Sequence, residues 1–229
     1  MLCSLTGGLD PGAGCYTQPV RILLASANRG KVSEVRRILG EQGIDVIGLP
    51  SNARTTEFET GDTYSANALL KARHYYAQTR VVTLADDSGL EVAALGGAPG
   101  VHSARYAAPG ATDNDRIEKL LRELDHVPAR DRRAAFVCAA AMVWAGGERL
   151  FTGSASGVLL TEARGSGGFG FDPVFYYEPL GRTFAELSED EKARVSHRGQ
   201  AFRRLALWLR ESGLLDTPGM GDRIDDPIK

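Results

Sequence analysis

A short apolar run that leads into two acids constrains the fold of this chain more than any other stretch. The run Val81–Leu84 is short and β-branched, which predicts a buried strand, and it continues into the polar segment Ala85–Leu90 (ADDSGL). In open α/β sheets, ligands bind just beyond the carboxyl ends of the strands. Neighbouring strand residues point to opposite faces, so we expect Asp86 and Asp87 to do different work, one on a metal ion or water and the other in supporting the loop. The alternative is that the segment is only a polar turn.

The bulk composition is that of a globular protein and excludes several classes. The chain has 229 residues, of which 43% are hydrophobic and 24% charged, which allows one large domain or two small ones. A formal net charge of −2 argues against a basic nucleic-acid-binding protein. No stretch reaches the ~18 apolar residues of a membrane span, and the first twenty residues lack a secretory signal pattern. Three widely spaced cysteines fit neither a disulfide framework nor a zinc site, so we expect a reduced, cytoplasmic setting.

The order of the predicted elements indicates an α/β protein with a mixed sheet. Apolar and β-branched runs predict strands over residues 20–25, 45–49, 81–84, 133–145 and 148–159. Apolar residues at helical spacing predict helices after residue 31 and over residues 62–78, 112–124 and 198–212. Thr112 with Asp115, and Ser188 with Glu191, have the spacing of capping boxes that open helices. Helices and strands alternate at first, and a long hairpin with a glycine pair at its turn then interrupts them.

The two ends of the chain are left outside this fold. Residues 1–19 contain glycine and proline without an apolar period, which predicts a flexible extension. Residues 216–229 are charged and contain proline, which predicts a loose tail. We therefore expect a single domain over residues 20–215.

The segment Ser26–Lys31 (SANRGK) is the first candidate site, because it joins a predicted strand to a predicted helix. Backbone N–H groups and the positive end of a helix favour anions there, and Lys31 adds a full charge. The segment is not a Walker A loop, because the required glycine spacing is absent and Val32 replaces the hydroxyl residue. A polar loop with a solvated lysine is the alternative.

Acids form the second candidate site. Glu57 and Glu59 lie in a polar loop, and Asp86 and Asp87 follow the central apolar run. Two to four oxygen ligands of this kind suit Mg²⁺, with water and substrate phosphates in the remaining positions. Such an ion also activates water for attack on phosphorus. The alternative is that the loop acids serve only to keep the loop solvated.

The stretch 167–173 (GGFGFDP) and the stretch 196–198 (SHR) supply groups suited to a purine base. Two phenylalanines in a glycine-rich loop suit stacking on a flat ligand, although burial in the core is the favoured alternative for Phe171. Arg198 offers a planar fork of donors that suits the 6-oxo group of a purine, as does a nearby backbone N–H. With Lys192 upstream, these groups and the two sites above predict a nucleoside triphosphate site.

At this point the residues match a known family. From Val20 to about Gly213 the chain resembles the inosine triphosphate pyrophosphatases, also called non-canonical purine NTP pyrophosphatases. Four groups of segments carry the resemblance: SANRGK at 26–31; ETG and NALLKAR at 59–61 and 67–73; ADDSGLEV and GGAPGVHSARY at 85–92 and 96–106; and GGFGFDPVF and EKARVSHRGQA at 167–175 and 191–201. Their shared order over nearly the whole chain makes the signal far more specific than any one motif.

The resemblance implies both an activity and a shape. The activity is a Mg²⁺-dependent hydrolysis of ITP, dITP or XTP to the monophosphate and pyrophosphate, which keeps deaminated purines out of DNA and RNA. One Mg²⁺ ion per active site is implied, and Mn²⁺ can replace it. The shape is an elongated α/β fold with two lobes around a central cleft, usually in a homodimer.

The resemblance also implies roles for particular residues. Asp87 would be the proton acceptor and a metal ligand, with Glu59 as the second metal ligand. The positions implied to bind substrate, mainly its phosphates, are Ser26, Ala27, Asn28, Arg29, Gly30, Lys31, Lys71, Ser88 and Lys192. The positions implied to form the base pocket are Phe169, Gly170, Phe171, Asp172, His197 and Arg198.

Two positions depart from the family pattern. Ala66 stands where bacterial relatives typically carry an acid, which puts metal affinity or rate in doubt. Phe171 stands where tyrosine is common, which removes a hydroxyl donor but keeps the ring. Two alternatives remain: a pyrophosphatase for other modified or pyrimidine nucleotides, and a catalytically weak nucleotide-binding protein.

Overall fold

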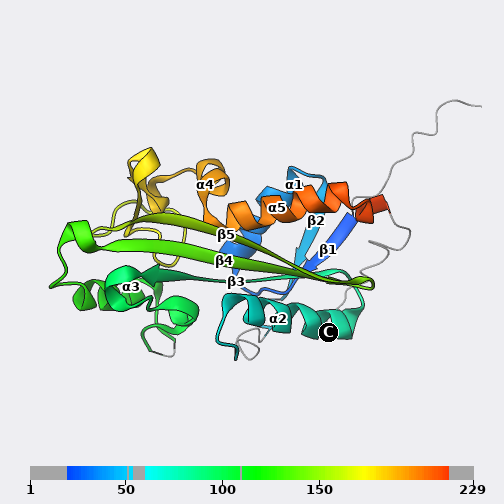
Figure 1. Cartoon of the computed structure of the whole chain (residues 1–229), viewed down its shortest axis with the longest axis horizontal. Helices are drawn as coiled ribbons and strands as arrows, with labels where there is room; N and C mark the ends of the chain where they lie inside the picture. The colour runs from blue at the N-terminus through cyan, green and yellow to red at the C-terminus, as the bar shows by residue number, and fades with distance from the viewer. Residues whose placement is uncertain (1–19, 51, 54–59, 109, 217–229) are drawn as a thin grey trace, which may run out of the picture.

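The computed structural model describes residues 20–50, 52–53, 60–108 and 110–216, which form an elongated molecule built on one mixed sheet (Figure 1). The strands lie in the order β2-β1-β3-β4-β5-β6-β7. Their bounds are β1 (Val20–Leu24), β2 (Ile44–Gly48), β3 (Thr83–Val92), β4 (Arg133–Trp144), β5 (Gly147–Leu159), β6 (Phe175–Tyr177) and β7 (Arg182–Thr183). β1 is parallel to β2 and β3, whereas the later pairs are antiparallel. The predicted α/β class with a mixed sheet is confirmed.

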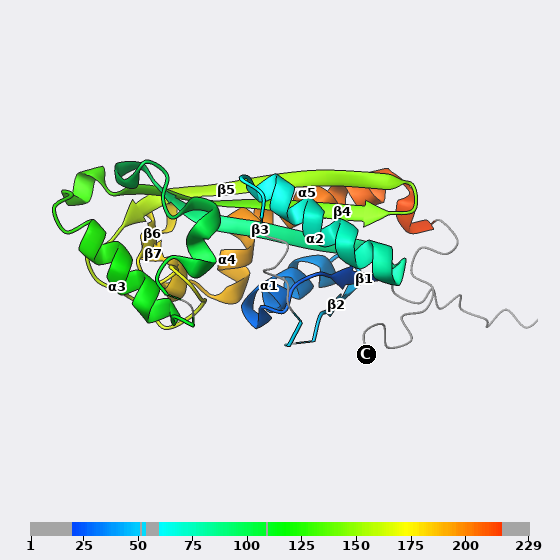
Figure 2. The ribbon, with the colours of Figure 1, turned by 90° about the horizontal axis from the view of Figure 1, so that it is seen from below.

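Helices cover both faces of this sheet. α1 and α5 pack against each other on one face, and α2 lies on the other (Figure 1, Figure 2). The bounds are α1 (Arg29–Gly40), α2 (Tyr64–Thr79), α3 (Asp113–Glu123), α4 (Glu189–Val195) and α5 (His197–Glu211). The capping boxes predicted at Thr112 and Ser188 open α3 and α4. None of the helices in the described ranges is both long and apolar enough to span a bilayer.

The core is divided by the sheet. Leu24 of β1, Val35 of α1 and Leu205 of α5 are buried together on one face. On the opposite face, Ala68 and Ala72 let α2 pack closely against the strands because alanine side chains are small. A third cluster, rich in aromatic rings, joins α3, β4 and β6. α1, α2, α3 and α5 are therefore held by the apolar stripes that their sequence patterns predict.

The hairpin of β4 and β5 runs along almost the whole molecule (Figure 1). Trp144 pairs with Gly147 across its turn, as the glycine pair predicts. Residues of β5 from Phe151 onward alternate between buried and exposed, because one face of the strand packs on α5. The predicted hairpin is confirmed.

β3 is longer than the sequence predicts, and this corrects the position of its acids. The apolar run is expected to end at Leu84, but the strand continues through both acids to Val92. The reason is non-local: β4 pairs with the whole of β3 and sets alanines opposite Asp86 and Asp87. Backbone pairing with a distant segment thus extends a strand across a sequence that resembles a turn.

β1 pairs with only the first residues of β3. The two strands pair at Thr83 and Leu84, and from Ala85 to Leu90 no described strand lies on that side of β3. Asp86 and Asp87 therefore lie just beyond the carboxyl end of β1, where an α/β sheet is expected to bind ligands. Their side chains point to opposite faces, as predicted, because Asp86 contacts α1 and α5 whereas Asp87 contacts α2.

Close packing of α5 on β5 generates a stability prediction. A Cβ at Gly153 would lie within 3 Å of the carbonyl oxygen of His197 and of the nitrogen of Ala201. Both are backbone atoms, so the start of α5 would have to shift. We expect Gly153→Ala to lower the free energy of unfolding by about 1–3 kcal/mol in chemical denaturation. Gly40→Ala adds the same methyl group where no atom lies within 4 Å, so it serves as the matched control. Equal stabilities of the two variants would contradict the close packing of Gly153 of β5 against the start of α5.

Candidate functional site

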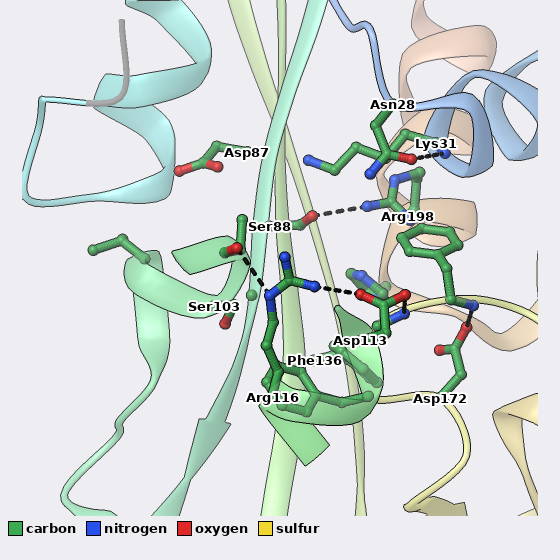
Figure 3. A pocket seen from close by; sticks show the side chains of 17 residues that line it. Asn28, Lys31, Asp87, Ser88, Ser103, Asp113, Arg116, Phe136, Asp172 and Arg198 are labelled. Carbon is green, nitrogen blue, oxygen red and sulfur yellow. Dashed lines mark hydrogen bonds and ion pairs between the residues drawn. The ribbon is translucent and has the colours of Figure 1, made fainter. Parts of the chain in front are cut away.

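A cavity lies along the free edge of β3, between the start of α1, the start of α3 and the loop that joins β5 to β6 (Figure 3). Its volume is about 780 Å³, counting space open to solvent, which is within the range of small-molecule sites. Residues predicted for phosphates and for the base both line it. They include Lys31, Asp87 and Ser88 from the predicted phosphate and metal positions, and Phe169, Phe171 and His197 from the predicted base pocket. The structure therefore brings the separate motifs into one cleft.

The predicted anion loop leads into α1 as expected. Asn28 is the N-cap residue, and its side-chain oxygen accepts a hydrogen bond from the N–H of Lys31 at 3.1 Å. Ser26 is buried, and its hydroxyl accepts from the N–H of Asn28. These bonds start the helix so that the Lys31 side chain enters the cleft, where its ammonium lies 3.2 Å from the carboxylate of Asp86.

Three other residues of this loop lie elsewhere. Ala27 and Arg29 line a separate depression with residues of α1 and β2. Gly30 lies under the ring of Phe169, where a Cβ would come within 3 Å of ring carbons. Gly30 therefore allows the aromatic ring to approach the first turn of α1.

One face of β3 presents Asp87 to α2. The carboxylate accepts a hydrogen bond from the side-chain amide of Asn67 at 2.9 Å, and the ammonium of Lys71 lies 3.8 Å away. All three side chains are buried, and Asn67 also accepts from the N–H of Gly61. Because Asn67 fixes one carboxylate oxygen, it limits rotation of Asp87. Ala66 lies in the first turn of α2, whereas Glu57 and Glu59 lie outside the described residues.

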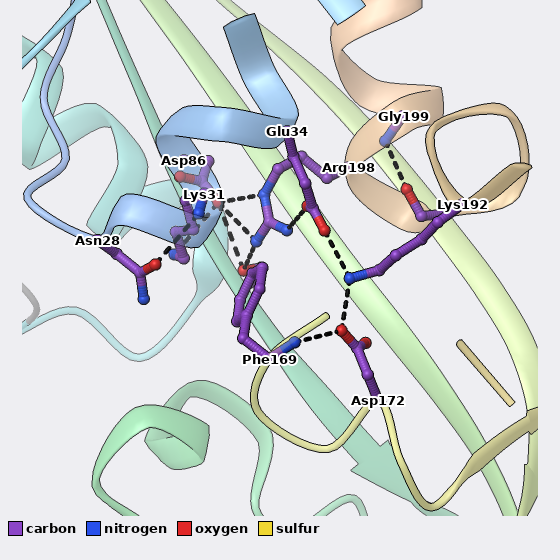
Figure 4. Close-up of polar contacts among 11 residues, drawn as sticks. Asn28, Lys31, Glu34, Asp86, Phe169, Asp172, Lys192, Arg198 and Gly199 are labelled. Carbon is purple, nitrogen blue, oxygen red and sulfur yellow. Dashed lines mark hydrogen bonds and ion pairs between the residues drawn. The ribbon is translucent and has the colours of Figure 1, made fainter. Parts of the chain in front are cut away.

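The opposite face of β3 presents Asp86 to a buried cluster of charges (Figure 4). Arg198 donates from Nε and from Nη2 to the same oxygen of Asp86, each at 3.1 Å. It also donates from Nη2 to the hydroxyl of Ser88 at 2.7 Å and from Nη1 to Glu34. All three guanidinium nitrogens are thus bonded to the protein. The predicted base-reading donor is first of all a link between β3, α1 and α5.

A second group of charges holds the predicted base loop. The ammonium of Lys192 lies between the carboxylates of Asp172 and Glu34 (Figure 4). Asp172 also accepts from the N–H of Phe169 at 2.8 Å, which closes the loop on itself. Lys192 lies 4.7 Å from the centre of the Phe169 ring, which gives a cation–π contact. The ring of Phe169 is therefore held in place at the rim of the cleft.

Ion pairing keeps Asp86, Glu34 and Lys192 charged, whereas burial raises the pKa of Asp172. Burial disfavours the carboxylate of Asp86, but Lys31 and Arg198 outweigh burial and hold its pKa below the ordinary range. Burial likewise opposes the charge of Glu34, yet Arg198 and Lys192 lower its pKa. The pKa of Lys192 is raised, because Asp172 and Glu34 overcome the effect of burial. The three lysines implied for phosphates (Lys31, Lys71 and Lys192) and Arg198, implied for the base pocket, each lie in an ion pair with a carboxylate.

Aromatic rings line part of the cavity. The imidazole of His197 stacks on Phe136 with centroids 4.7 Å apart and an angle of 9°. Phe171 is buried, as favoured from the sequence, and meets Tyr106 edge to face while still lining the cavity. Nδ1 of His197 is buried without a hydrogen-bond partner among the described residues. The ring of His197 lines the cavity, although this nitrogen itself is buried.

Sequence reasoning missed four residues that shape the site. Glu34, Asn67, Asp113 and Arg116 belong to α1, α2 and α3 and contact predicted site residues or line the cavity. Glu34 follows Lys31 by three residues, so helical spacing alone places the two on one face. Asn67 precedes Lys71 by four residues in the same way. The contact of Asp113 with the predicted base loop has no local signal, because it joins segments 57 residues apart.

This chain is similar to several known proteins over most of its length. A family model described as the Ham1 family matches residues 22–208. A dITP/XTP pyrophosphatase of Frankia alni is 50% identical over 202 residues, covering 84% of this chain and 98% of the relative. A HAM1 protein structure from Coxiella burnetii is 42% identical with a TM-score of 0.72, covering 84% of this chain and 99% of the other. A structure of a nucleoside-triphosphatase / dITP/XTP pyrophosphatase from Mycobacterium abscessus is 41% identical with a TM-score of 0.63, covering 82% and 98%.

The buried imidazole generates a pH prediction. Burial, with the charges of Arg198 and Lys192 nearby, holds the pKa of His197 well below its usual value. The unfolded chain regains a histidine pKa of about 6.5 and therefore binds more protons at mildly acidic pH than the folded chain does. The free energy of unfolding should thus fall as the pH drops from about 7 to about 5.5. We expect His197→Gln to flatten this slope in chemical denaturation, whereas His126→Gln, at an exposed histidine, should keep it. Parallel slopes for the two variants would contradict the buried neutral imidazole.

Proposed function

The chain belongs to the Ham1 family, and from this premise we propose that it hydrolyses nucleoside triphosphates of deaminated purines, namely ITP, dITP and XTP, to the monophosphate and pyrophosphate. Relatives at 42–50% identity carry the name dITP/XTP pyrophosphatase. Removal of such nucleotides would keep deaminated purines out of DNA and RNA.

One observation carries the proposal: a single cavity is lined both by acid, hydroxyl and lysine side chains and by aromatic rings. Asp87, Ser88 and Lys31 make up the first set, and Phe169 and His197 belong to the second. A nucleotide with its base against the aromatic rings would extend its phosphates toward Asp87. The resemblance predicts the same orientation from the motifs alone.

Mg²⁺ fits the donor set and the charge of this cleft. The described residues contain no group of three or more histidine, cysteine, aspartate or glutamate side chains suited to a metal, so a cage made only of protein is not expected there. Asp87 supplies hard oxygen atoms, and Glu59, which lies outside the described residues, would be the second ligand. The cations of the cleft are balanced by carboxylates, so a triphosphate would bring an excess of negative charge. When bound, the ion would offset this charge and polarise phosphoryl oxygens, and Mn²⁺ would serve in its place.

The chain's own residues would carry out the proton transfer and the positioning. Asp87 would accept the proton of a water molecule that attacks the α-phosphorus in line with the leaving pyrophosphate. Asn67 holds one oxygen of that carboxylate at 2.9 Å, and the ammonium of Lys71 lies 3.8 Å from the other, so the orientation of the proposed base is restricted. Lys31 and Lys71 would stabilise the charge that develops on the pyrophosphate.

Base selection would rest on the aromatic rings. The ring of Phe169 would stack on the purine, and His197, which lines the cavity, would contact the base. Arg198 would contribute mainly by holding this wall in place, because its nitrogens are bonded to Asp86, Ser88 and Glu34. A purine with an amino group at position 6 would leave buried donors unpaired, which costs roughly 1–3 kcal/mol each. We also extend to this chain the homodimeric state and cytoplasmic location that the resemblance and the cysteine content predict.

Product analysis with purified protein tests the function. With Mg²⁺ present, dITP and XTP should give the monophosphate and pyrophosphate, while dATP, dGTP and dTTP react slowly. Removal of divalent ions with EDTA should stop the reaction, and added Mn²⁺ should restore it. Orthophosphate as the first product would move the attack to the terminal phosphorus and contradict the mechanism. Preference for a pyrimidine nucleotide, or binding without turnover, would favour one of the two alternatives left by the sequence.

Substitution of the proposed base tests its role separately. Asp87→Asn keeps the shape of the side chain but removes its ability to accept a proton. We expect the kcat for dITP to fall by about 10²–10⁴-fold, as for loss of a general base. Circular dichroism should show that the variant folds, and Asp125→Asn, at an exposed aspartate, should retain full turnover. Near-normal kcat in the Asp87 variant would exclude it as the proton acceptor.

A further inference from the structure

Arg116 is a cation of the cleft that neither the motifs nor the proposed mechanism uses. It lies on α3 and lines the cavity from the wall opposite α1 and α5 (Figure 3). Its side chain is 20% exposed. Nε donates to the carbonyl oxygen of Ala104 at 3.0 Å, and Nη1 forms an ion pair with Asp113. Nη2 has no partner among the residues that the structure describes, and Figure 3 shows it pointing along the cleft toward Ser88.

The guanidinium of Arg116 is held by two separate attachments. Asp113 accepts from Arg116 through one carboxylate oxygen and from the N–H of Gly170 at 2.7 Å through the other. Gly170 belongs to the loop that carries Phe169, so Asp113 joins α3 to the proposed base platform. Because a guanidinium is planar, the bonds at Nε and Nη1 together fix the direction of Nη2. The remaining donor is thus set in advance rather than free to rotate.

The direction of Nη2 indicates which part of a bound nucleotide it could contact. Ser88 and Asp87 are consecutive residues of β3 that both line the cavity, and Asp87 is the proposed base for attack on the α-phosphorus. Nη2 therefore points toward the segment of β3 along which the phosphates of the nucleotide would lie. Guanidinium N–H groups form strong, charge-assisted bonds with phosphate oxygens.

We propose that Arg116 is a further substrate-binding residue, which donates from Nη2 to an oxygen of the α-phosphate of the bound nucleotide. Asp113 acts as a positioning residue, because it orients Arg116 and at the same time holds the loop of Phe169. The inference rests on the proposed function, since it assumes a nucleotide with its base against the aromatic rings. It adds a contact from α3, on the wall of the cavity opposite Lys31 and Arg198.

Binding of inosine 5′-monophosphate and of inosine to the full chain tests this contact by calorimetry. The two probes differ only in the phosphate. We expect Arg116→Gln to weaken binding of the monophosphate by about tenfold, a typical effect of losing a hydrogen bond from a charged group, and to leave inosine binding unchanged. Arg116→Lys keeps the charge without the planar fork and should lose less affinity. Arg122→Gln removes an exposed arginine from the same helix and is the matched control, with both affinities unchanged.

The outcomes separate this inference from the proposed function. If wild-type protein hydrolyses dITP but Arg116→Gln binds the monophosphate normally, the contact with the α-phosphate is wrong and the function stands. If inosine and the monophosphate weaken equally, Arg116 only supports the base loop, which also overturns the inference. If wild-type protein hydrolyses neither dITP nor XTP, the proposed function fails and the inference fails with it. Asp113→Asn should raise the KM for dITP more than it changes kcat, as expected of a positioning residue.

Discussion

The buried pair of Arg198 and Asp86 is the interaction on which the rest of the site depends. Arg198 comes from the first turn of α5 and Asp86 from the middle of β3, and both are fully buried. Through Glu34 and Ser88 the same guanidinium also fixes α1 and the next residue on that face of β3. Loss of one partner from such a pair is far more damaging than loss of both, because it leaves a buried charge uncompensated. Ion pairs therefore hold the walls of the cleft where β1 no longer pairs with β3.

Two adjacent acids divide their tasks because they occupy one strand. Asp86 faces the charges that hold α1, β3 and α5 together, and Asp87 faces Asn67, Lys71 and the cleft. The two-residue period of a strand makes this separation unavoidable. Asp86 can thus pair with Arg198 while Asp87 presents its carboxylate to the cavity. Because the two side chains lie on opposite faces of β3, their negative charges are kept apart.

Local geometry explains what could be predicted from the sequence. The capping boxes at Thr112 and Ser188, the long hairpin and the opposite orientation of the two acids all follow from residues close in the chain. The extension of β3 to Val92 could not be predicted in this way, because it depends on pairing with β4 some fifty residues later. The same holds for the pairing of Lys31 with Asp86 and of Asp113 with Gly170. The sequence identified several charges of the site but not Glu34, Asp113 or Arg116, and only the fold shows which charges neutralise one another.

The side of β3 without a neighbouring strand has a consequence for how the cleft can bind a ligand. Where no strand lies beside a sheet edge, its backbone N–H and C=O groups are open to another partner. Leu90 already bonds through its N–H to the hydroxyl of Ser103 rather than to a strand. Main-chain groups along this edge do not depend on side-chain identity, so most substitutions leave them intact. Binding of a ligand to these backbone groups would therefore depend on the order of the strands. A comparison of sequence motifs would not detect it.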